Sequence, residues 1–392
     1  MIRSKRSVYI KVVLFATVIA LPNILFSQAT LPAPDHIVIL ILENHSYDEV
    51  IGNTAGPHIN ALAVDDHAAL FTQSFAIEHP SQPNYLDFYS GCNQGITDDA
   101  LPALFPFTTD NLGSQLITGG YTFVTYSEDL PSIGFNGASS GNYARKHNPA
   151  ANWMGTGTNQ IPITTNQPFN AFPTDYTKLP TVCYVVPNQN NDMHNGSFPA
   201  NLTTADNWLY KNLNSYIQWA KTHNSLFILT FDEDDYSGSN QIATIFSGQM
   251  IKPGKYSEAI DHYSVLRTIE DLYGLPYACN ASTASSITDI WNNSSSVIVN
   301  GSASDVFSVY PNPSVGGITL HIEESKIGKL GRVGIFNELG KKIFEAPIEN
   351  VSTQEILSRT WQGHPVHSAL PAKPEDRRQK NCSIFFRVGS LF

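Results

Sequence analysis

HIVILILEN, residues 36–44, is the most informative stretch of this chain. Residues 37–42 are all apolar, and the run is too short for a typical helix and ends in polar residues. Such a run is typical of a strand buried on both faces, as in the centre of a parallel sheet. Similar short runs recur at YTFVTYSED (121–129), TVCYVVPN (181–188), SLFILTFDED (225–234) and QIATIFSG (241–248).

Helical patterns lie between these strand-like runs. Residues 205–224 and residues 261–275 each carry apolar side chains along one helical stripe, and Gly274 suits the C-terminal end of the second helix. Strands that alternate with helices predict an α/β fold built around a layered sheet.

Composition and charge narrow the classes of function. The chain has 392 residues, of which 42% are hydrophobic and 15% charged, so a disordered or fibrous protein is excluded. The net charge is −11, and residues 30–300 alone hold 25 acidic and 8 basic residues. A surface with so few lysines and arginines cannot neutralise a polyphosphate backbone, so we expect no nucleic-acid partner. The acidic charge does not exclude a pocket that binds cations.

The N-terminal residues predict export. Residues 1–28 combine a basic start with a short apolar run that contains Pro22, which is typical of a secretory signal peptide. No later segment offers about 20 unbroken apolar residues, so we expect no stable membrane insertion. The mature protein is therefore expected to be secreted and to reside in the periplasm, at the cell surface or outside the cell. Its four cysteines would meet an oxidising compartment, but their spacing predicts no pairing.

Three further segments differ from the α/β pattern in composition or periodicity. Residues 95–175 are rich in Gly, Pro, Asn and Thr, and we interpret them as long loops over one end of the sheet. Residues 281–305 have the composition of a linker. Residues 306–350 alternate apolar and polar residues around an ELGK turn, which predicts a small C-terminal β-domain.

Two pairs of polar residues, each with at least one acid, follow predicted strands. Glu43 and Asn44 end the first strand, and Asp232 and Glu233 end the strand within 225–234. Ligands bind outside the carboxyl ends of the strands in open α/β sheets. Acidic pairs brought together there would repel each other unless a cation lay between them. Their oxygen atoms suit a divalent ion, which leaves calcium, magnesium, manganese and zinc open.

The alternative is that such acids are solvated residues in ordinary polar turns. We prefer that interpretation for Asp234 and Asp235, and we prefer metal binding for Glu43, Asp232 and Glu233.

A serine precedes a predicted helix in HPSQPNYLDFYSG, residues 79–91. Pro83 fits the first turn of a helix, which places Ser81 at its positive end. A serine there is usually a helix cap. A nearby metal ion would change its role by lowering the pKa of the hydroxyl, and the helix N-terminus would favour an incoming phosphoryl group.

Two histidines lie in the regions that follow predicted strands. Asp192 and His194 follow the strand at 181–188, and His262 opens the helix at 261–275. For these two histidines the alternatives are metal ligation, protonation of a leaving group, or an ordinary role in the core or on the surface. His36, His45, His58 and His223 we interpret as structural or exposed.

Five blocks of this sequence, in register over residues 35–276, resemble the phosphoesterase family of acid phosphatases and phospholipases C, within the alkaline-phosphatase superfamily. The blocks are LILENHSYDEVIGN, HPSQPNYLDFYSG, NDMHNGSFPANLTTADNWL, LTFDEDD with NQIATIFSGQMIKPGKY, and DHYSVLRTIEDLYGL. The resemblance implies metal-dependent phosphoryl transfer on a three-layer α/β/α sandwich of alkaline-phosphatase type, with a mostly parallel central sheet.

The resemblance also implies roles for single residues. Glu43 with Asn44 and Asp232 with Glu233 match the two metal-binding pairs, and Ser81 matches the nucleophile. His262, Asp192 and His194 match positions that contact phosphate, a second metal ion or the leaving group.

The predicted function is a secreted, metal-dependent acid phosphatase that hydrolyses small phosphate monoesters through a phosphoserine, with residues 29–280 as its catalytic domain. The compact core, which has the motifs ENHSYD and PSQPNY but not the longer insertions of the phospholipases, resembles the small acid-phosphatase branch of the family. One alternative is a phospholipase C-like phosphodiesterase. Another is a secreted binding protein without catalytic activity on a phosphatase scaffold.

The segment VYPNPSVGGITLHIE followed by VGIFNELGKKIFE resembles the C-terminal sorting domain of the bacterial type IX secretion system. This resemblance implies the secretion machinery as a partner. Residues 351–392 depart from that pattern, because the alternation stops and the segment carries 3 acidic and 6 basic residues. We interpret these residues as an irregular, aberrant end, such as a frameshift would produce.

Overall fold

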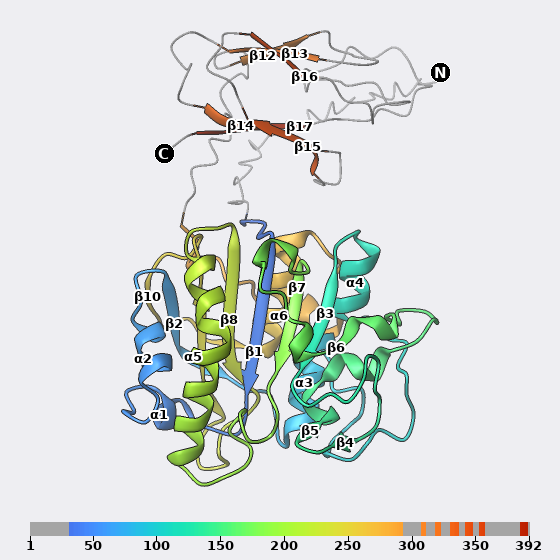
Figure 1. Ribbon diagram of the computed structural model, residues 1–392, viewed down its shortest axis with the longest axis vertical. Helices are drawn as coiled ribbons and strands as arrows, with labels where there is room; N and C mark the ends of the chain where they lie inside the picture. Colours follow the sequence, from blue (N-terminus) through green and yellow to red (C-terminus); the bar gives the residue numbers. More distant parts are fainter. Residues whose placement is uncertain are drawn as a thin grey trace, which may run out of the picture. The chain divides into compact units, whose positions relative to one another are not determined.

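The computed structural model describes residues 31–292 and six strands between residues 307 and 390 (Figure 1). The predicted signal peptide, residues 1–28, lies outside the described residues. Among the helices of the described part, none combines the length and the apolar character needed to cross a membrane.

A nine-stranded sheet forms the centre of residues 31–292 (Figure 1), with the strand order β10-β2-β9-β8-β1-β7-β3-β6 and with β11 paired to β2. Its strands are β1 (His36–Leu42), β2 (Ala68–Phe75), β3 (Phe123–Ser127), β6 (Asn166–Pro168), β7 (Val182–Val186), β8 (Ser225–Phe231), β9 (Gln241–Ser247), β10 (Gly254–Tyr256) and β11 (Ile260–Asp261). β1 runs parallel to β7 and β8, and only β9 is antiparallel to its neighbours. The mostly parallel sheet is therefore confirmed.

The five predicted strands are all present, and β1 lies between β7 and β8 at the centre of the sheet. Residues Ile37 to Leu42 are at most 5% exposed, as expected for a strand covered on both faces. The prediction missed β2, whose sequence AALFTQSF mixes apolar and polar residues.

Helices cover both faces of the sheet (Figure 1). On one face, α1 (Tyr47–Val50), α2 (Pro57–Ala63) and α5 (Ala200–Ala220) share a core with Val38, Leu40 and Leu42 of β1. On the other face, α3 (Ser81–Ser90), α4 (Leu112–Thr118) and α6 (His262–Tyr273) pack together, and Phe88 of α3 contacts Tyr184 of β7. This arrangement is the predicted three-layer α/β/α sandwich. The two predicted long helices correspond to α5 and α6, and α6 ends at Gly274 with a φ of 62°.

The segment 95–175 is mostly irregular, as predicted, and includes α4 and the short antiparallel pair β4 (Ser139–Ser140) and β5 (Tyr143–Ala144). Four 3-10 turns lie in the same part of the chain and a fifth follows directly after it. They are η1 (Arg145–His147), η2 (Pro149–Trp153), η3 (Ile163–Thr165), η4 (Phe169–Ala171) and η5 (Tyr176–Lys178). Arg145, His147 and Trp153 are almost fully buried, so part of this segment belongs to the core.

Residues 281–292 differ from the predicted linker. Ile287 and Ile290 are 0% exposed and Trp291 is 7% exposed, and Ile251 forms a β-bridge with Trp291. A disulfide between Cys92 and Cys279 joins the end of α3 to η6 (Cys279–Ser282). The folded unit therefore extends to residue 292, because three apolar residues of this mostly polar stretch are buried in it. The rest of the predicted linker, residues 293–305, lies outside the described residues.

The C-terminal strands form two antiparallel sheets of three strands each, with the orders β12-β13-β16 and β15-β14-β17. Their bounds are β12 (Phe307–Tyr310), β13 (Ile318–Ile322), β14 (Leu330–Phe336), β15 (Lys342–Pro347), β16 (Thr353–Ile356) and β17 (Phe385–Ser390). Four of these strands lie within residues 306–350, where we predicted a small β-domain, and β16 and β17 lie beyond it, in the segment that we interpreted as irregular.

Candidate active site

The predicted acids meet at the carboxyl ends of β1 and β8. These strands pair in parallel with Leu42 opposite Phe231, so the residues that follow them emerge at the same edge of the sheet. The backbone N–H of Asp232 donates to the carbonyl of Leu42 over 3.0 Å. Glu43, Asp232 and Glu233 are each at most 1% exposed.

Asn44 links the two pairs. Its backbone has a φ of 51°, a left-handed conformation that asparagine tolerates better than most residues. In this conformation its backbone N–H donates to Asp232 Oδ1 over 2.9 Å, and its side-chain Nδ2 donates to Glu233 Oε1 over 2.5 Å. The turn after β1 therefore fixes the second acidic pair as well as the first.

Ser81 lies against these acids. It is the first residue of α3 and is 2% exposed. Its Oγ donates to Glu43 Oε2 over 3.0 Å, lies 3.3 Å from Glu233 Oε1, and accepts from Asn44 Nδ2 over 3.3 Å. The serine, Glu43 with Asn44, and Asp232 with Glu233 thus form one cluster.

The buried carboxylates form a set of atoms that suits a cation. Asp232 Oδ2 is buried without a hydrogen-bond partner among the described residues. Burial, and then the charges of Glu43 and Glu233, raise the pKa of Asp232 well above its usual value. Burial and the charge of Glu43 also raise the pKa of Glu233 to about 8. A divalent ion among these oxygens would relieve the repulsion and satisfy the unpaired atom.

His147 is a site residue that the sequence analysis missed. It belongs to η1, and its Nε2 lies 3.2 Å from Glu43 Oε2 while its Nδ1 lies 2.9 Å from Asp192 Oδ2. Burial opposes its charged form, but the two carboxylates outweigh burial and raise the pKa of His147 to about 10. Burial also opposes the charged form of Glu43, but the charge and hydrogen bond of His147, together with Lys146 and Tyr85, outweigh burial and lower the pKa of Glu43 to about 2. Tyr85 stacks on His147 and donates its hydroxyl to Glu43.

Replacing His147 by glutamine should destabilise the metal-free protein by about 3 kcal/mol at neutral pH, because it removes one partner of a buried ion pair. The folded-state pKa of His147 lies above its ordinary value of 6.5. Its stabilising effect is therefore complete below pH 6.5 and is lost as the pH rises toward 10. Urea unfolding in chelator across this range measures the effect. The exposed His223→Gln is the matched control, and an equal slope in His147→Gln and wild type would contradict the assignment.

His79, two residues before the serine, was also missed. Its Nδ1 lies 2.6 Å from Glu233 Oε2, and its ring stacks on Tyr236 at 3.9 Å. Asp234 faces the other side of this ring, with Oδ1 3.4 Å from His79 Nε2, and accepts from the backbone N–H of Asn240. Asp234 is 1% exposed, so its interpretation as a solvated residue is wrong.

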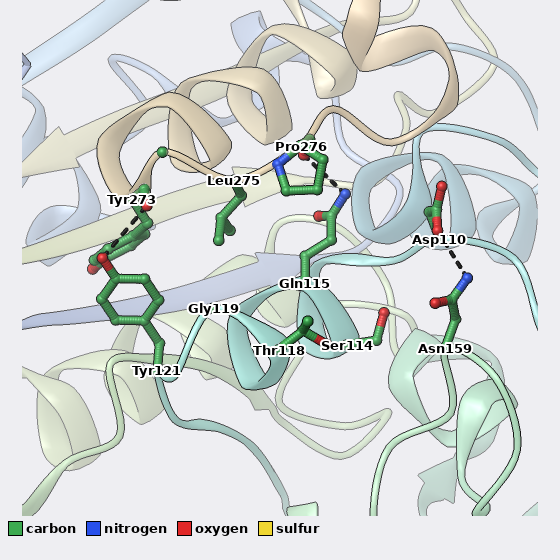
Figure 2. A pocket seen from close by; sticks show the side chains of 11 residues that line it. Asp110, Ser114, Gln115, Thr118, Gly119, Tyr121, Asn159, Tyr273, Leu275 and Pro276 are labelled. Carbon is green, nitrogen blue, oxygen red and sulfur yellow. Dashed lines mark hydrogen bonds between the residues drawn. The ribbon is translucent and has the colours of Figure 1, made fainter. Parts of the chain in front are cut away.

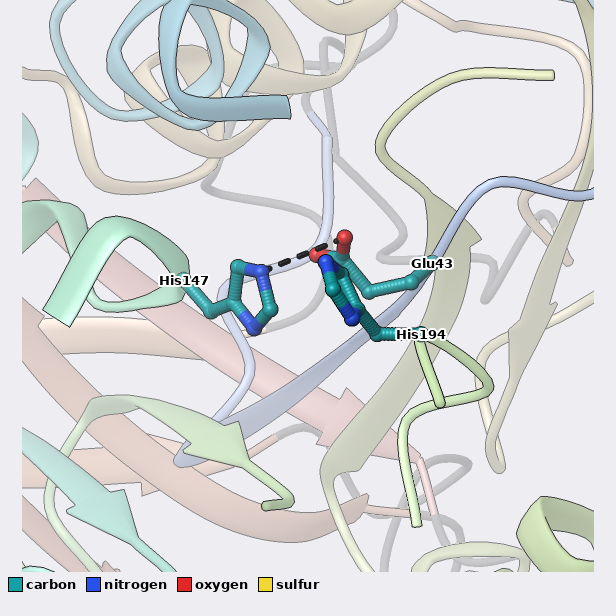
Figure 3. A group of neighbouring side chains, drawn as sticks. All are labelled: Glu43, His147 and His194. Atoms are coloured by element: carbon teal, nitrogen blue, oxygen red, sulfur yellow. Dashed lines mark ion pairs between the residues drawn. The ribbon is translucent and has the colours of Figure 1, made fainter. Parts of the chain in front are cut away.

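Asp192 and His194 are brought to the Glu43 side of the site. Asp192 Oδ1 accepts from the backbone N–H of His194 over 2.9 Å. Figure 3 shows the side chains of Glu43, His147 and His194 gathered together, and one potential ligand atom from each lies within 4.8 Å of the others. This group could hold a metal ion.

His262 lies behind Asp232 in the sequence-distant helix α6 and does not join the group of Glu43, His147 and His194. Its Nε2 lies 2.8 Å from the carbonyl oxygen of Asp232, and its ring packs against Phe88. Burial lowers the pKa of His262. The contacts that the structure gives His262 therefore support the loop that carries Asp232, whereas His194 lies beside Glu43 and His147.

A cavity of about 370 Å³ lies away from this cluster, between α4 and the end of α6 (Figure 2). It lies on the amino-terminal side of β3, where Tyr121 precedes the strand. None of the predicted site residues lines it, so it is separate from the acid and serine cluster.

Three relatives are similar to this chain in sequence. A phosphatidylinositol-3-phosphatase from Mycobacterium tuberculosis is 45% identical over 276 residues, which cover 70% of this chain and 88% of that protein. A probable acid phosphatase from Kluyveromyces lactis is 28% identical over 66% of this chain and 63% of its own length. An acid phosphatase from Aspergillus fumigatus is 30% identical over 60% of this chain and 54% of its own length.

Among solved structures, a protein of the alkaline phosphatase superfamily from Vibrio parahaemolyticus is similar with a TM-score of 0.46 and 13% identity, over 82% of this chain and 84% of that chain.

Two family models match the chain. The secretion system C-terminal sorting domain matches residues 308–362, which indicates secretion and continues past residue 350. The phosphoesterase family matches residues 57–276, a range that holds Ser81 and the second acidic pair. The chain therefore belongs to the phosphoesterase family, as a hydrolase of phosphoric esters with a C-terminal sorting domain.

Proposed function

We propose that this protein is a metal-dependent phosphatase that hydrolyses phosphate monoesters through a phosphoserine at Ser81. The observation that carries the proposal is the position of Ser81 Oγ, 3.0 Å from Glu43 Oε2 and 3.3 Å from Glu233 Oε1, at the first residue of α3. A hydroxyl in this position can be activated by a cation bound to the same carboxylates.

Glu43, Asn44, Asp232 and Glu233 would hold the divalent ion, which supplies charge neutralisation and lowers the pKa of the serine hydroxyl. Glu43 and Asn44 aim Ser81 Oγ by the hydrogen bonds described above. This oxygen attacks phosphorus in line with the leaving group, so that a new bond to Ser81 forms as the bond to the leaving oxygen breaks. The peptide dipoles of the first turn of α3 favour the phosphoryl group beside Ser81.

His194 is the better placed of the two predicted proton donors. It is partly exposed and lies beside Glu43, whereas His262 is 2% exposed and contacts the backbone of Asp232. We assign the protonation of the leaving alcohol to His194 and a positioning role to His262. Water then attacks the phosphoserine, His194 takes its proton, and phosphate and the free serine are released.

The relatives favour a monoesterase over a phospholipase C-like phosphodiesterase. Their names, phosphatidylinositol-3-phosphatase and acid phosphatase, both describe removal of a phosphate group. A binding protein without catalytic activity is disfavoured, because the serine and both acidic pairs are present and in contact. The sorting domain supports the secretion machinery as a partner of the chain.

The test is a substrate panel with the purified protein, supplied in turn with calcium, magnesium, manganese and zinc. We expect metal-dependent release of phosphate from p-nitrophenyl phosphate, and slower cleavage of bis-p-nitrophenyl phosphate and phosphatidylcholine. Preferential cleavage of the diesters would support the phosphodiesterase instead, and no cleavage with any ion would support the binding protein.

A further inference from the structure

Lys146 brings a positive charge to the acidic site from a segment outside the family motifs quoted above. Its Nζ lies 2.6 Å from Asp99 Oδ2 and 3.2 Å from His194 Nε2. The side chain is 16% exposed, so it remains within reach of solvent. Residues 30–300 contain only 8 basic residues, which makes a cation at this place notable.

Asp99 connects Lys146 to the helix of the nucleophile. Its Oδ1 accepts the backbone N–H of Gln82, the residue after Ser81, over 3.0 Å. The Gln82 side chain donates to the carbonyls of Asp98 and Ala100, at 2.8 and 2.7 Å, and so binds this loop to the first turn of α3. On its other side Lys146 contacts His194, which lies beside Glu43. These two sets of contacts place the ammonium group between the Asp99 loop at the start of α3 and His194.

The charge balance of the site calls for such a cation. The carboxylates of Glu43, Asp192, Asp232 and Glu233 are all buried there, and Asp99 adds a fifth carboxylate beside Lys146. One divalent ion would offset two of these charges. A phosphate monoester carries a charge of about −1.5 to −2 at neutral pH, whereas a diester carries a single negative charge. A further cation is therefore most important for the monoester.

We propose that Lys146, held by Asp99, binds a non-bridging oxygen of the substrate's phosphoryl group and makes the site select monoesters over diesters. Lys146 is in this sense a specificity-determining residue, and Asp99 is a positioning residue that acts through it. The inference rests on the proposed function, since it names how the same site recognises its substrate class.

The experiment compares p-nitrophenyl phosphate with bis-p-nitrophenyl phosphate, which share a leaving group and differ in charge. In Lys146→Met, kcat/KM for the monoester should fall by about 100-fold, as when one preorganised charge-stabilising group is removed, and kcat/KM for the diester by about 10-fold or less. Lys146→Arg should retain most of the monoester preference, and Asp99→Asn should lose part of it. Lys178→Met, at a side chain that is 75% exposed, is the matched control and should behave as wild type.

A binding measurement separates this inference from the proposed function. Calorimetry of metal-loaded protein should show that Lys146→Met weakens binding of inorganic phosphate by about 10-fold and changes binding of dimethyl phosphate little. This readout needs no turnover, so it tests Lys146 whether or not Ser81 is the nucleophile. Equal losses for both esters with unchanged phosphate affinity would overturn the proposal and leave Lys146 only its contacts with Asp99 and His194.

Discussion

Replacing Ser81 by alanine should lower kcat for p-nitrophenyl phosphate by about 10⁴-fold or more, because the group that forms the covalent intermediate is lost. Metal binding should remain, since the side chains of Glu43, Asp232 and Glu233 are unchanged. Steady-state kinetics measure the first effect, and elemental analysis of the purified variant measures the second. Rapid acid quenching of wild type with substrate should also trap a phosphorylated Ser81, and the variant should yield none.

Ser90→Ala is the matched control for this substitution. Ser90 lies in the same helix α3 and is 1% exposed, but its hydroxyl donates to the carbonyl of Leu86 at the far end. The control should keep activity near that of wild type. Turnover in Ser81→Ala within a few-fold of wild type would remove Ser81 from its role, and with it the phosphoserine.

Removal of the metal ion should abolish activity and also destabilise the folded protein. Chelation leaves the carboxylates of Glu43, Asp232 and Glu233 buried together without a cation, and their mutual repulsion then opposes folding. We expect a loss of about 10³-fold or more in kcat, and a rise in Tm of several degrees when the right ion is added back. Activity that survives exhaustive chelation would contradict the metal-dependent mechanism.

Asp232→Asn separates the two effects. The asparagine oxygen can still accept from the backbone N–H of Asn44 and of Glu233, which lie 2.9 and 2.7 Å from Asp232 Oδ1. The variant should lose metal binding and activity, yet in chelator its Tm should equal or exceed that of wild type, because one buried charge is gone. Asp235→Asn, at an exposed residue of the same loop, is the control. A metal-induced rise in Tm that persists in Asp232→Asn would show that the ion binds elsewhere.

Local sequence predicted the parts of the molecule whose signal lies in neighbouring residues. The apolar run 36–44 predicted a central strand because burial on both faces demands apolar residues at successive positions. β2 was missed because AALFTQSF carries polar residues at its end, and the apolar residues of 287–291 were hidden within a polar stretch.

The residues of the candidate site also fall into those with a local sequence signal and those without one. Glu43, Asn44, Asp232 and Glu233 were predicted because each pair directly follows a recognisable strand, and Ser81 because Pro83 marks the start of its helix. His79 had a local signal, since it opens the motif that contains Ser81. His147 and Lys146 had none, because they lie in an irregular segment without periodicity.

The sequence by itself determined the α/β class, the strands that carry the acids, the serine at a helix start and the family. Only the tertiary structure decided which charges meet: that Glu43 lies between Ser81 and His147, that Lys146 reaches His194, and that His262 supports Asp232 from behind. The physical reason is that strand and helix patterns arise from short-range periodic burial. The partner of a buried charge is chosen by chain segments up to 189 residues apart, whose meeting depends on the whole fold.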